Sequence, residues 1–259
     1  MAENPGRLHA DRGRALSFGG VAAMYDKARP SYPAALVDAL MAFAPRYVLD
    51  VGCGTGKASQ LFIDRGCDVL GVEPDPAMAA IARHHGVRIE EGAFEEWDPR
   101  GRMYDLIVSG QAWHWVDPEV GPAKAASVLY PGGHLAMFWN RGRPDAAIAA
   151  EFDAIYERMA PTIARDTGAL NPPAEPGDRF AQLANVGQFS NTEARTYEWD
   201  TAYNRASWTA LISTQSDHVL LPDAQRQELL DALGAAIDAA GGTLPYHYST
   251  LLVLATRSS

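Results

Sequence analysis

The sequence predicts an α/β fold in which helices cover both faces of a mostly parallel sheet. Two observations lead to this prediction. Between residues 47 and 139, short apolar runs alternate with helical segments, which is the pattern of parallel strands buried on both faces. The first of these runs ends in closely spaced glycines followed by a helix, an arrangement that lets a ligand approach the backbone at the end of a strand.

The residues before the first strand predict a leader and two helices. Residues 1–17 are polar and contain no apolar core of a secretory signal, so we expect a flexible leader. A helical pattern covers residues 18–27, breaks at two prolines and resumes over residues 34–44, where Pro45 ends it.

Five strands are predicted next, because each is a short apolar run bounded by glycine, proline or charged residues. They span residues 47–51, 68–72, 87–90, 104–109 and 134–139. The helices predicted between them span residues 57–65, 76–84 and 119–129, and a turn is predicted at residues 131–133.

The pattern changes after Asn140. The predicted elements are a helix at 146–159, a proline-rich loop at 171–177, a strand at 192–201, helices at 205–212 and 222–240, and a strand at 248–256. We therefore expect a leader (1–17), a core with N-terminal helices (18–140), a helical cap that includes the sixth strand (141–245), and a last core strand with the tail (246–259). The cap is either peripheral packing or a cover over the substrate end of the sheet, where loops of such folds carry specificity.

Composition excludes several classes of partner. The formal net charge is −10 and no basic run stands out, which argues against nucleic acid and against anionic membranes. No apolar run approaches the roughly 20 residues that span a bilayer. The two cysteines fit reduced thiols, so we expect a cytoplasmic protein, and no Cys/His cluster has the spacing of a metal site.

The strongest motif is the glycine loop after the first predicted strand, with glycines at Gly52, Gly54 and Gly56. Glycines are needed where a ligand approaches a backbone at which a Cβ atom would clash. Glu73 ends the second predicted strand, where a carboxylate accepts hydrogen bonds from ribose hydroxyls in nucleoside-binding folds. The pattern therefore indicates a nucleoside-containing ligand.

The spacing argues against two other phosphate-binding loops. A dinucleotide fingerprint requires a third glycine, but that position is Lys57 or Ser59, depending on the starting glycine. A P-loop fails as well, because its first glycine would fall on Val51. Asp50, just before the loop, would repel a pyrophosphate and suits a ligand with an ammonium group.

These residues resemble the cofactor motifs of class I S-adenosylmethionine-dependent methyltransferases, in the small-molecule branch with a methyltransferase type 11 domain. The resemblance covers about residues 18–140 and includes the stretches 21–33, 92–95 and 129–133. Residues 111–115 (QAWHW) are similar to a stretch of trans-aconitate-methyltransferase-like proteins. The resemblance implies a Rossmann-like, seven-stranded sheet whose last strand is antiparallel and lies at the sheet edge. Lys124 and Ser127 depart from the family pattern and look like surface-helix positions.

The resemblance also implies the roles of the site residues. Glu73 would bind the ribose, Asp50 would lie near the methionine ammonium group, and Phe94 would border the adenine. The residues implied to bind the cofactor are Tyr25, Arg29, Asp50, Gly52, Cys53, Gly54, Gly56, Glu73, Pro74, Met78, Ala93, Phe94, Ser109, Gly110 and Gln111. Arg29 has three readings: a partner of the methionine carboxylate, a partner of an acidic substrate, or a solvated arginine before a proline.

His114 is the candidate catalytic residue, because it follows the fourth predicted strand and an imidazole accepts a proton from a hydroxyl or an amine. The alternative is a packed histidine between two tryptophans. Weaker candidates for the acceptor side are Tyr203, His218 and His247, and Trp139 and Asn140 end the fifth predicted strand.

The expected function is transfer of a methyl group from S-adenosylmethionine to an oxygen or nitrogen of a small molecule, a carboxylate among the options. The reaction is a direct in-line displacement with S-adenosylhomocysteine as product. Two alternatives are a nicotinamide-dependent oxidoreductase and a non-catalytic module that binds the same cofactor. We expect a monomer or a homodimer.

Overall fold

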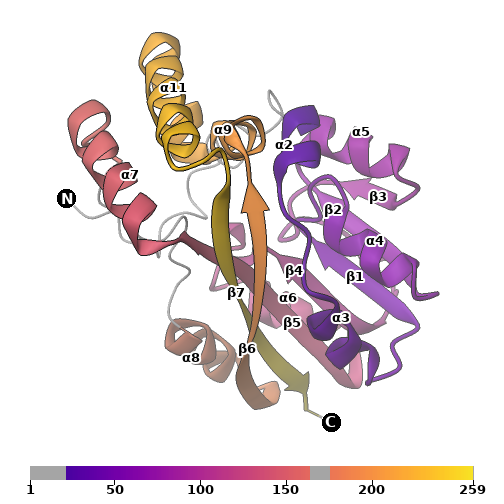
Figure 1. Cartoon of the computed structure of the whole chain (residues 1–259). Helices are drawn as coiled ribbons and strands as arrows, with labels where there is room; N and C mark the ends of the chain where they lie inside the picture. The colour runs from indigo at the N-terminus through magenta and orange to yellow at the C-terminus, as the bar shows by residue number, and fades with distance from the viewer. Residues whose placement is uncertain (1–21, 164–175, 259) are drawn as a thin grey trace.

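The computed structural model describes residues 22–163 and 176–258, and within them a single sheet has the strand order β3-β2-β1-β4-β5-β7-β6 (Figure 1). The strands are β1 (Tyr47–Val51), β2 (Asp68–Glu73), β3 (Arg88–Glu91), β4 (Tyr104–Gly110), β5 (Leu129–Pro144), β6 (Phe189–Tyr203) and β7 (Leu244–Arg257). The first five strands pair in parallel, and β7 is antiparallel to both β5 and β6. The predicted mostly parallel sheet of seven strands with an antiparallel last strand is confirmed.

Helices connect the strands and cover the sheet. They are α2 (Ala22–Ala28), α3 (Ala34–Met41), α4 (Lys57–Ile63), α5 (Pro76–His84), α6 (Gly121–Val128), α7 (Ala146–Met159), α8 (Pro176–Val186), α9 (Arg205–Ser213), α10 (Ser216–Val219) and α11 (Asp223–Ala239), with a short 3-10 turn, η3 (Trp113–Trp115).

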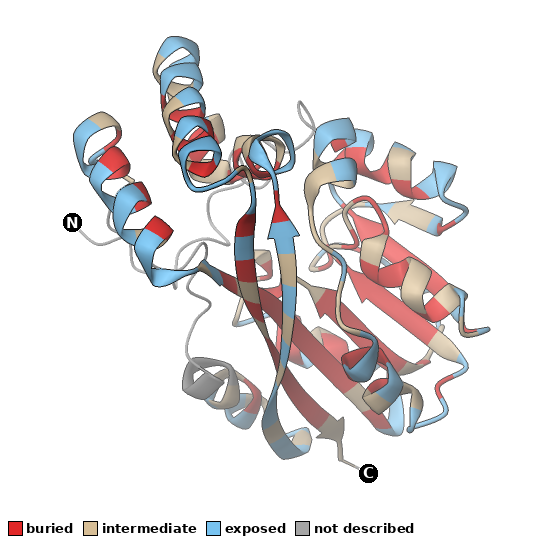
Figure 2. Cartoon of the chain, in the orientation of Figure 1, coloured by how far each residue is buried: buried red, intermediate tan, exposed pale blue. Residues whose placement is uncertain are grey.

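Two apolar layers hold the sheet between helices, because successive side chains of a strand point to opposite faces. Val48 packs in one layer with residues of α3 and α4, such as Phe62. Its neighbour Leu49 packs in the other layer with Val128 of α6. Figure 2 shows the resulting band of buried residues along the central strands. The prediction of helices on both faces is therefore confirmed.

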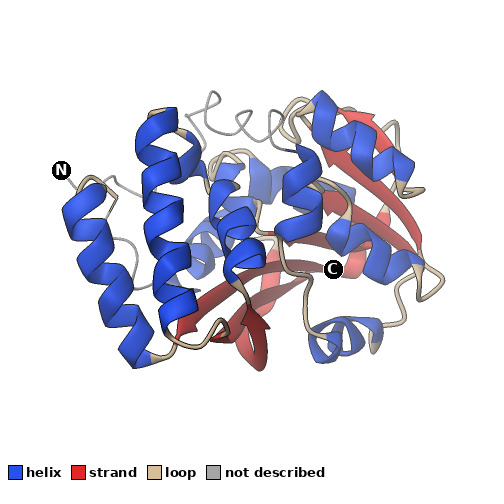
Figure 3. Cartoon of the chain, turned by 45° about the horizontal axis from the view of Figure 1, so that its top comes forward, coloured by secondary structure: helices blue, strands red, loops and turns tan. Residues whose placement is uncertain are grey.

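A third apolar cluster lies beyond the end of the sheet. Helices α7, α9 and α11 pack there against the ends of β6 and β7, and Figure 3 shows them grouped on one side of the molecule. Phe152, Trp208, Leu233 and Tyr246 are among its buried side chains. We call α7, α9, α10 and α11 the helical cap. The predicted boundaries of the cap stay a prediction, although β5 and β7 both run across them.

Three sequence expectations need correction. The last strand, β7, lies between β5 and β6, so β6 forms the sheet edge. Residues 131–133 do not precede the fifth strand but belong to β5. The register with β4 shifts in this stretch, from Tyr104 opposite Leu129 to Leu106 opposite His134, and Gly132 within it has a φ of +80°. Helix α8 was not expected, and it begins at Pro176 inside the predicted proline-rich loop.

Some expectations fall outside the described residues. These are the leader at 1–17, the first four residues of the predicted helix at 18–27, and residues 171–175 of the proline-rich loop. In the described ranges, no helix combines the length and apolarity needed to cross a membrane.

A chain of side-chain hydrogen bonds crosses the edge of the sheet toward its centre. Trp199 on β6 donates from its indole nitrogen to the Thr250 hydroxyl on β7 at 2.9 Å. Thr250 donates to Oδ1 of Asn140 on β5 at 2.7 Å, and Asn140 donates from Nδ2 to the carbonyl oxygen of Ser31 at 2.9 Å. Three strands and the segment before α3 are thereby tied together by polar groups that are largely shielded from water.

Replacing Thr250 with valine should lower the free energy of unfolding by about 1–3 kcal/mol, because Asn140 loses its donor and Trp199 its acceptor in a buried place. Urea unfolding of the purified variant measures this difference. Thr196→Val on the exposed face of β6 is the control, and we expect it to stay within about 0.5 kcal/mol of the parent. Equal effects of the two substitutions would contradict the prediction.

Candidate active site

A cavity of about 430 Å³ lies at the carboxyl ends of the central strands, where ligands bind in doubly wound folds. Its lining divides into two sets by origin. The first set, the cofactor half, comes from the loops after β1, β2 and β3. The second set, the acceptor half, comes from α2 and the segment after it, the loop after β4, β5, the helical cap and β7. The residues of the acceptor half are Tyr25, Arg29, Pro30, Tyr32, Gly110, Gln111, Ala112, His114, Trp115, Val116, Asn140, Gly142, Leu211, Gln215, Ser216, Tyr246 and Tyr248.

The glycine loop presents its backbone to the cofactor half. The N–H group of Gly52 donates to the carbonyl oxygen of Val72 at 2.9 Å, which fixes the start of the loop against β2. Gly54 has a φ of +56°, and no heavy atom lies within 4 Å of the place where its Cβ atom would be. The backbone is therefore open to the cavity at the position where the sequence predicted close approach of a ligand.

Glu73 lies beside this loop and is buried. Its carboxylate accepts hydrogen bonds from the N–H groups of Gly54, at 2.8 Å, and Asp75, at 2.9 Å. Burial raises the pKa of Glu73 to about 7, and these two hydrogen bonds oppose that rise. The carboxylate also lines the cavity, so its remaining lone pairs face the space that a ligand would occupy.

Asp50 is fully buried at the end of β1 and carries a carboxylate oxygen that the protein does not satisfy. Its Oδ2 atom accepts a hydrogen bond from the Ser59 hydroxyl at 2.6 Å. Its Oδ1 atom has no hydrogen-bond partner within the described part of the chain. Burial raises the pKa of Asp50 to about 6. A buried carboxylate with one unpartnered oxygen that borders a cavity fits a ligand with an ammonium group, as in S-adenosylmethionine.

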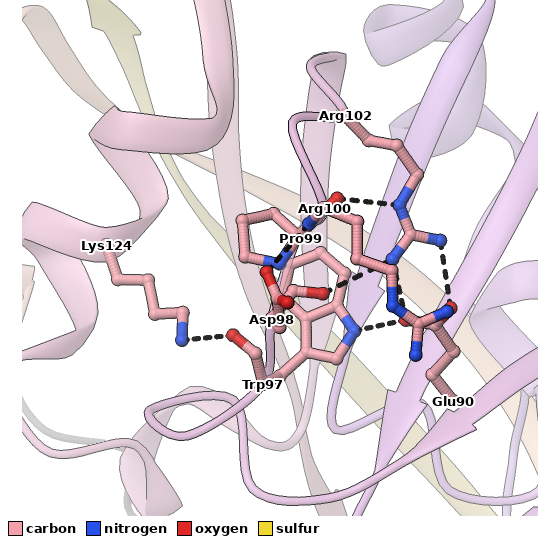
Figure 4. Close-up of polar contacts among 7 residues, drawn as sticks. All are labelled: Glu90, Trp97, Asp98, Pro99, Arg100, Arg102 and Lys124. Carbon is pink, nitrogen blue, oxygen red and sulfur yellow. Dashed lines mark hydrogen bonds and ion pairs between the residues drawn. The ribbon is translucent and has the colours of Figure 1, made fainter.

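The loop after β3 brings Ala93 and Phe94 to the cofactor half, and a polar cluster holds this loop in place (Figure 4). Arg102 donates two hydrogen bonds to the Glu90 carboxylate, at 2.9 and 2.7 Å, and the Trp97 indole donates to the same carboxylate at 2.5 Å. The loop is therefore anchored on its outer side to β3.

Lys124 anchors the same loop from α6, which corrects its interpretation as a surface-helix position. Its ammonium group donates to the carbonyl oxygen of Glu95 at 2.9 Å. It also donates to the carbonyl oxygen of Trp97 (Figure 4). It also lies 5.7 Å from the centre of the Phe94 ring, a cation–π contact. Partial burial lowers the pKa of Lys124. Ser127 is exposed, as expected.

On the acceptor half, Arg29 joins α2 to the helical cap. Its Nε atom donates to the Thr214 hydroxyl at 2.9 Å, and its Nη2 atom donates to the Thr214 carbonyl oxygen at 2.8 Å and to Gln215 Oε1 at 3.1 Å. The guanidinium group also lies over the Tyr25 ring, 4.9 Å from its centre. Arg29 is therefore bonded to the segment beside the helical cap and is not a solvated side chain. Its pairing with the methionine carboxylate or with an acidic substrate stays a prediction.

His114 lies in η3, shortly after Gln111 in the loop that follows β4, and lines the cavity. The indole nitrogen of Trp139, a buried residue of β5, donates a hydrogen bond to His114 Nδ1 at 3.2 Å. Gln111 donates from its side-chain amide to the carbonyl oxygen of Asn140 at 3.1 Å. The backbone N–H group of Gln111 also donates to the carbonyl oxygen of Phe138 at 2.8 Å, so the loop after β4 is fixed to β5 at several points.

The structure brings most of the predicted site residues to this one cavity. Those that line it are Tyr25, Arg29, Asp50, Gly52, Cys53, Gly54, Glu73, Pro74, Met78, Ala93, Phe94, Gly110, Gln111 and His114. Gly56 and Ser109 do not line it. Gly56 begins α4 with a φ of +87°, and a Cβ atom there would lie 2.9 Å from Val87. Ser109 is buried and donates to the carbonyl oxygen of Val51 at 2.9 Å. Both positions support the loops around the cavity.

The weaker candidates from the C-terminal part do not line the cavity. His218 is buried in the cap at 2.8 Å from the Tyr156 hydroxyl, and burial lowers its pKa to about 4. His247 bonds to Asp200 and Glu198 near the surface. Tyr203 bonds through its hydroxyl to the Tyr248 hydroxyl at 2.7 Å.

Tyr246 and Tyr248 are the lining residues that sequence reasoning missed most clearly. They lie two positions apart on β7 and therefore on the same face of the sheet. In the sequence, these two tyrosines alternate with the polar residues His247 and Ser249, and this alternation could have indicated an earlier start of the strand. The expected strand began only at Tyr248, and nothing local to the sequence indicated which face the cavity would take. Among the described residues, no group of three or more His, Cys, Asp or Glu side chains is placed to hold a metal ion.

The sheet has the topology of class I methyltransferases. The site adds a glycine loop, an acidic residue at the end of β2 where such folds bind a ribose, and a buried carboxylate with one unpartnered oxygen at the end of β1. The model of a methyltransferase domain matches residues 48–133. An uncharacterised methyltransferase of Mycobacterium tuberculosis is 31% identical over 244 residues, covering 91% of this chain and 94% of that protein. The chain belongs to the S-adenosylmethionine-dependent methyltransferase family.

Further relatives extend the comparison. A trans-aconitate 2-methyltransferase of Acidovorax ebreus is 28% identical over 203 residues, covering 75% of this chain and 73% of that protein. A solved structure described as a type II methyltransferase from Anaeromyxobacter dehalogenans has a TM-score of 0.62 at 26% identity, covering 87% and 97% of the two chains. A phosphoethanolamine N-methyltransferase of Haemonchus contortus, solved with S-adenosylhomocysteine, shares the fold with a TM-score of 0.56 at 13% identity, covering 93% and 58%.

Asp50→Asn should make the ligand-free protein more stable at pH 8. The raised pKa means that the folded state binds the proton more tightly than the unfolded state, so the cost of the charge is absent below about pH 4 and complete above about pH 6. A shift from 3.8 to about 6 corresponds to a cost on the order of 3 kcal/mol.

Thermal unfolding at several pH values measures this effect. We expect the variant to melt roughly 5 °C higher than the parent at pH 8, with the gain shrinking toward pH 5. The exposed Glu119→Gln substitution is the control and should change neither the melting temperature at pH 8 nor its dependence on pH. A gain that does not depend on pH would contradict a charge origin.

Lys124→Met should weaken S-adenosylhomocysteine binding roughly 10-fold, because the loop that carries Phe94 loses two carbonyl anchors. Calorimetric titration of the folded variant measures the dissociation constant. Ser127→Ala on the same helix is the control and should bind like the parent. An unchanged affinity in Lys124→Met would show that the loop keeps its position without this anchor.

Proposed function

We propose that this methyltransferase transfers the methyl group to a carboxylate oxygen of a small acid. The observation that carries the proposal is the chemistry of the acceptor half. Its lining residues, all within the described ranges, include the Arg29 guanidinium, several phenol and amide groups, and no aspartate or glutamate. A pocket with a fixed cation and neutral donors favours an anionic ligand.

Apart from His114, the lining residues of the same half include no evident base. Burial raises the pKa of the phenols of Tyr32, Tyr246 and Tyr248, so these groups stay protonated and act as hydrogen-bond donors. An alcohol, phenol or ammonium acceptor must lose a proton during transfer, whereas a carboxylate is already ionised at neutral pH. The donor-rich lining therefore fits a carboxylic acid better than the other acceptor classes.

S-adenosylmethionine supplies a methyl group on a positively charged sulfur, and its transfer to a carboxylate leaves an ester and a neutral thioether. Within the cofactor half, Glu73 would accept from the ribose hydroxyls and Asp50 would pair with the ammonium group. Ala93 and Phe94 would border the adenine. From the adjoining end of the acceptor half, the backbone of Gly110 and Gln111 would flank the sulfur. Arg29 would pair with the acceptor, since its hydrogen bonds hold it to the helical cap.

The comparisons support this acceptor class without fixing the molecule. A relative from Acidovorax ebreus, similar over three quarters of this chain, is named for methylation of an acid, trans-aconitate. In this proposal the helical cap supplies the acceptor specificity, because Leu211, Gln215 and Ser216 reach the cavity from it. The chain would act on a free small molecule and not on a nucleic acid.

Incubation with methyl-labelled S-adenosylmethionine and a panel of acceptors tests the proposal. The panel contains trans-aconitate, other di- and tricarboxylic acids, phenols and primary amines. We expect label in an acid, released by alkali as methanol because methyl esters hydrolyse. Glu73→Ala is the negative control and should abolish transfer. Alkali-stable label in an amine or a phenol would overturn the carboxylate proposal while leaving methyltransferase activity intact.

Arg29→Met should raise the KM for the acid acceptor at least 10-fold and leave S-adenosylhomocysteine affinity within about 3-fold, because the guanidinium acts on the acceptor half. Steady-state kinetics and calorimetry measure the two quantities separately. Lys27→Met removes an exposed cation from the same helix and should change neither. A loss of S-adenosylhomocysteine affinity alone would assign Arg29 to the methionine carboxylate.

A further inference from the structure

The contact between Trp139 and His114 determines what the imidazole is able to do. The indole N–H group only donates hydrogen bonds, so His114 Nδ1 at 3.2 Å must be the acceptor. The neutral ring that makes this bond carries its proton on Nε2. Trp139 is buried among the apolar residues under the loop after β4, which leaves the indole little freedom to turn away.

This tautomer conflicts with a role as general base. A histidine that removes a proton through Nε2 needs a lone pair there and a proton on Nδ1, as in a histidine oriented by a carboxylate. Here a proton on Nδ1 would set two N–H donors against each other across the contact with Trp139. The sequence-based interpretation of His114 as a proton acceptor therefore does not fit the contact that the structure shows.

Resting on the carboxylate proposal above, we propose that His114 is a hydrogen-bond donor that holds the acceptor's carboxylate through Nε2–H, and that Trp139 is the positioning residue that fixes this tautomer. His114 lines the cavity on the side of the acceptor half, as do the amides of Gln111 and Asn140 and the guanidinium of Arg29. A neutral donor there orients an anionic oxygen and removes no proton, which matches an acceptor that needs no base.

The tautomer is measured directly by nuclear magnetic resonance of the full chain with ¹⁵N-labelled histidine. The His114 signals are assigned by their loss in His114→Gln. At pH 7.5 we expect a protonated Nε2 and an unprotonated Nδ1. Trp139→Phe removes the donor and should shift the signals toward a mixture of tautomers, whereas Trp115→Phe, which removes the neighbouring indole, should leave the tautomer unchanged. A proton on Nδ1 in the parent protein would overturn the proposal.

Kinetics with trans-aconitate as the probe separate a donor from a base. The glutamine side chain offers an N–H donor near the position of Nε2 and cannot act as a base. His114→Gln should therefore keep kcat/KM within about 5-fold of the parent, while His114→Ala should lose roughly 10- to 100-fold, mostly in KM. Equal loss in both variants, mostly in kcat, would indicate a base and overturn the proposal.

Calorimetry with S-adenosylhomocysteine verifies that each variant retains the cofactor site. A parent protein that methylates amines or phenols and no acid would contradict the carboxylate acceptor, and with it the ligand proposed for His114. The resonance experiment would still decide the tautomer, because it requires no acceptor. Failure of the carboxylate proposal and failure of the tautomer proposed for His114 are therefore distinguishable.

Discussion

The structure depends on two carboxylates, Asp50 and Glu73, buried at the ends of neighbouring strands with no cation paired to either among the described residues. Burial raises the pKa of both carboxylates, and the charge of Asp50 adds to the rise at Glu73. Burying them is unfavourable for the empty protein. The apolar layers on both faces of the sheet provide the stability that offsets this cost. A bound ligand with an ammonium group and ribose hydroxyls would reduce the cost. The cofactor half is thus built to be completed by its ligand.

The parts of the fold that the sequence predicted are those encoded by local patterns. The run at Tyr47–Val51, apolar except for Asp50, forms β1 with the expected bounds, because a strand buried on both faces requires a largely apolar sequence. Helix α5 also matches, since Asp75 caps it and Pro76 occupies its first turn. Glu73 and the glycine loop were identifiable for the same reason: their spacing follows from the geometry of one strand, one turn and the adjacent strand.

Features that depend on distant segments were not predictable in this way. Whether β7 or β6 forms the sheet edge depends on how the cap connection returns to the sheet, and no local pattern encodes it. Lys124 resembles an exposed helical lysine in sequence, yet the loop carrying Phe94 folds back to place two carbonyl oxygens on its ammonium group. Tyr246 faces the cavity because β7 runs beside β5, a pairing between residues about one hundred positions apart.

The two halves of the cavity therefore differ in how they are constructed. The cofactor half uses consecutive strand ends of one sheet, and its geometry follows from the sheet itself. The acceptor half is assembled from α2, the loop after β4, β5, the cap and β7, and polar contacts such as Arg29 to Thr214 hold these segments in register. A substitution in the first half acts on the ligand common to the family. Under the proposed function, a substitution in the second half would act mainly on the acceptor, so that one stable sheet could serve acceptors of different chemistry.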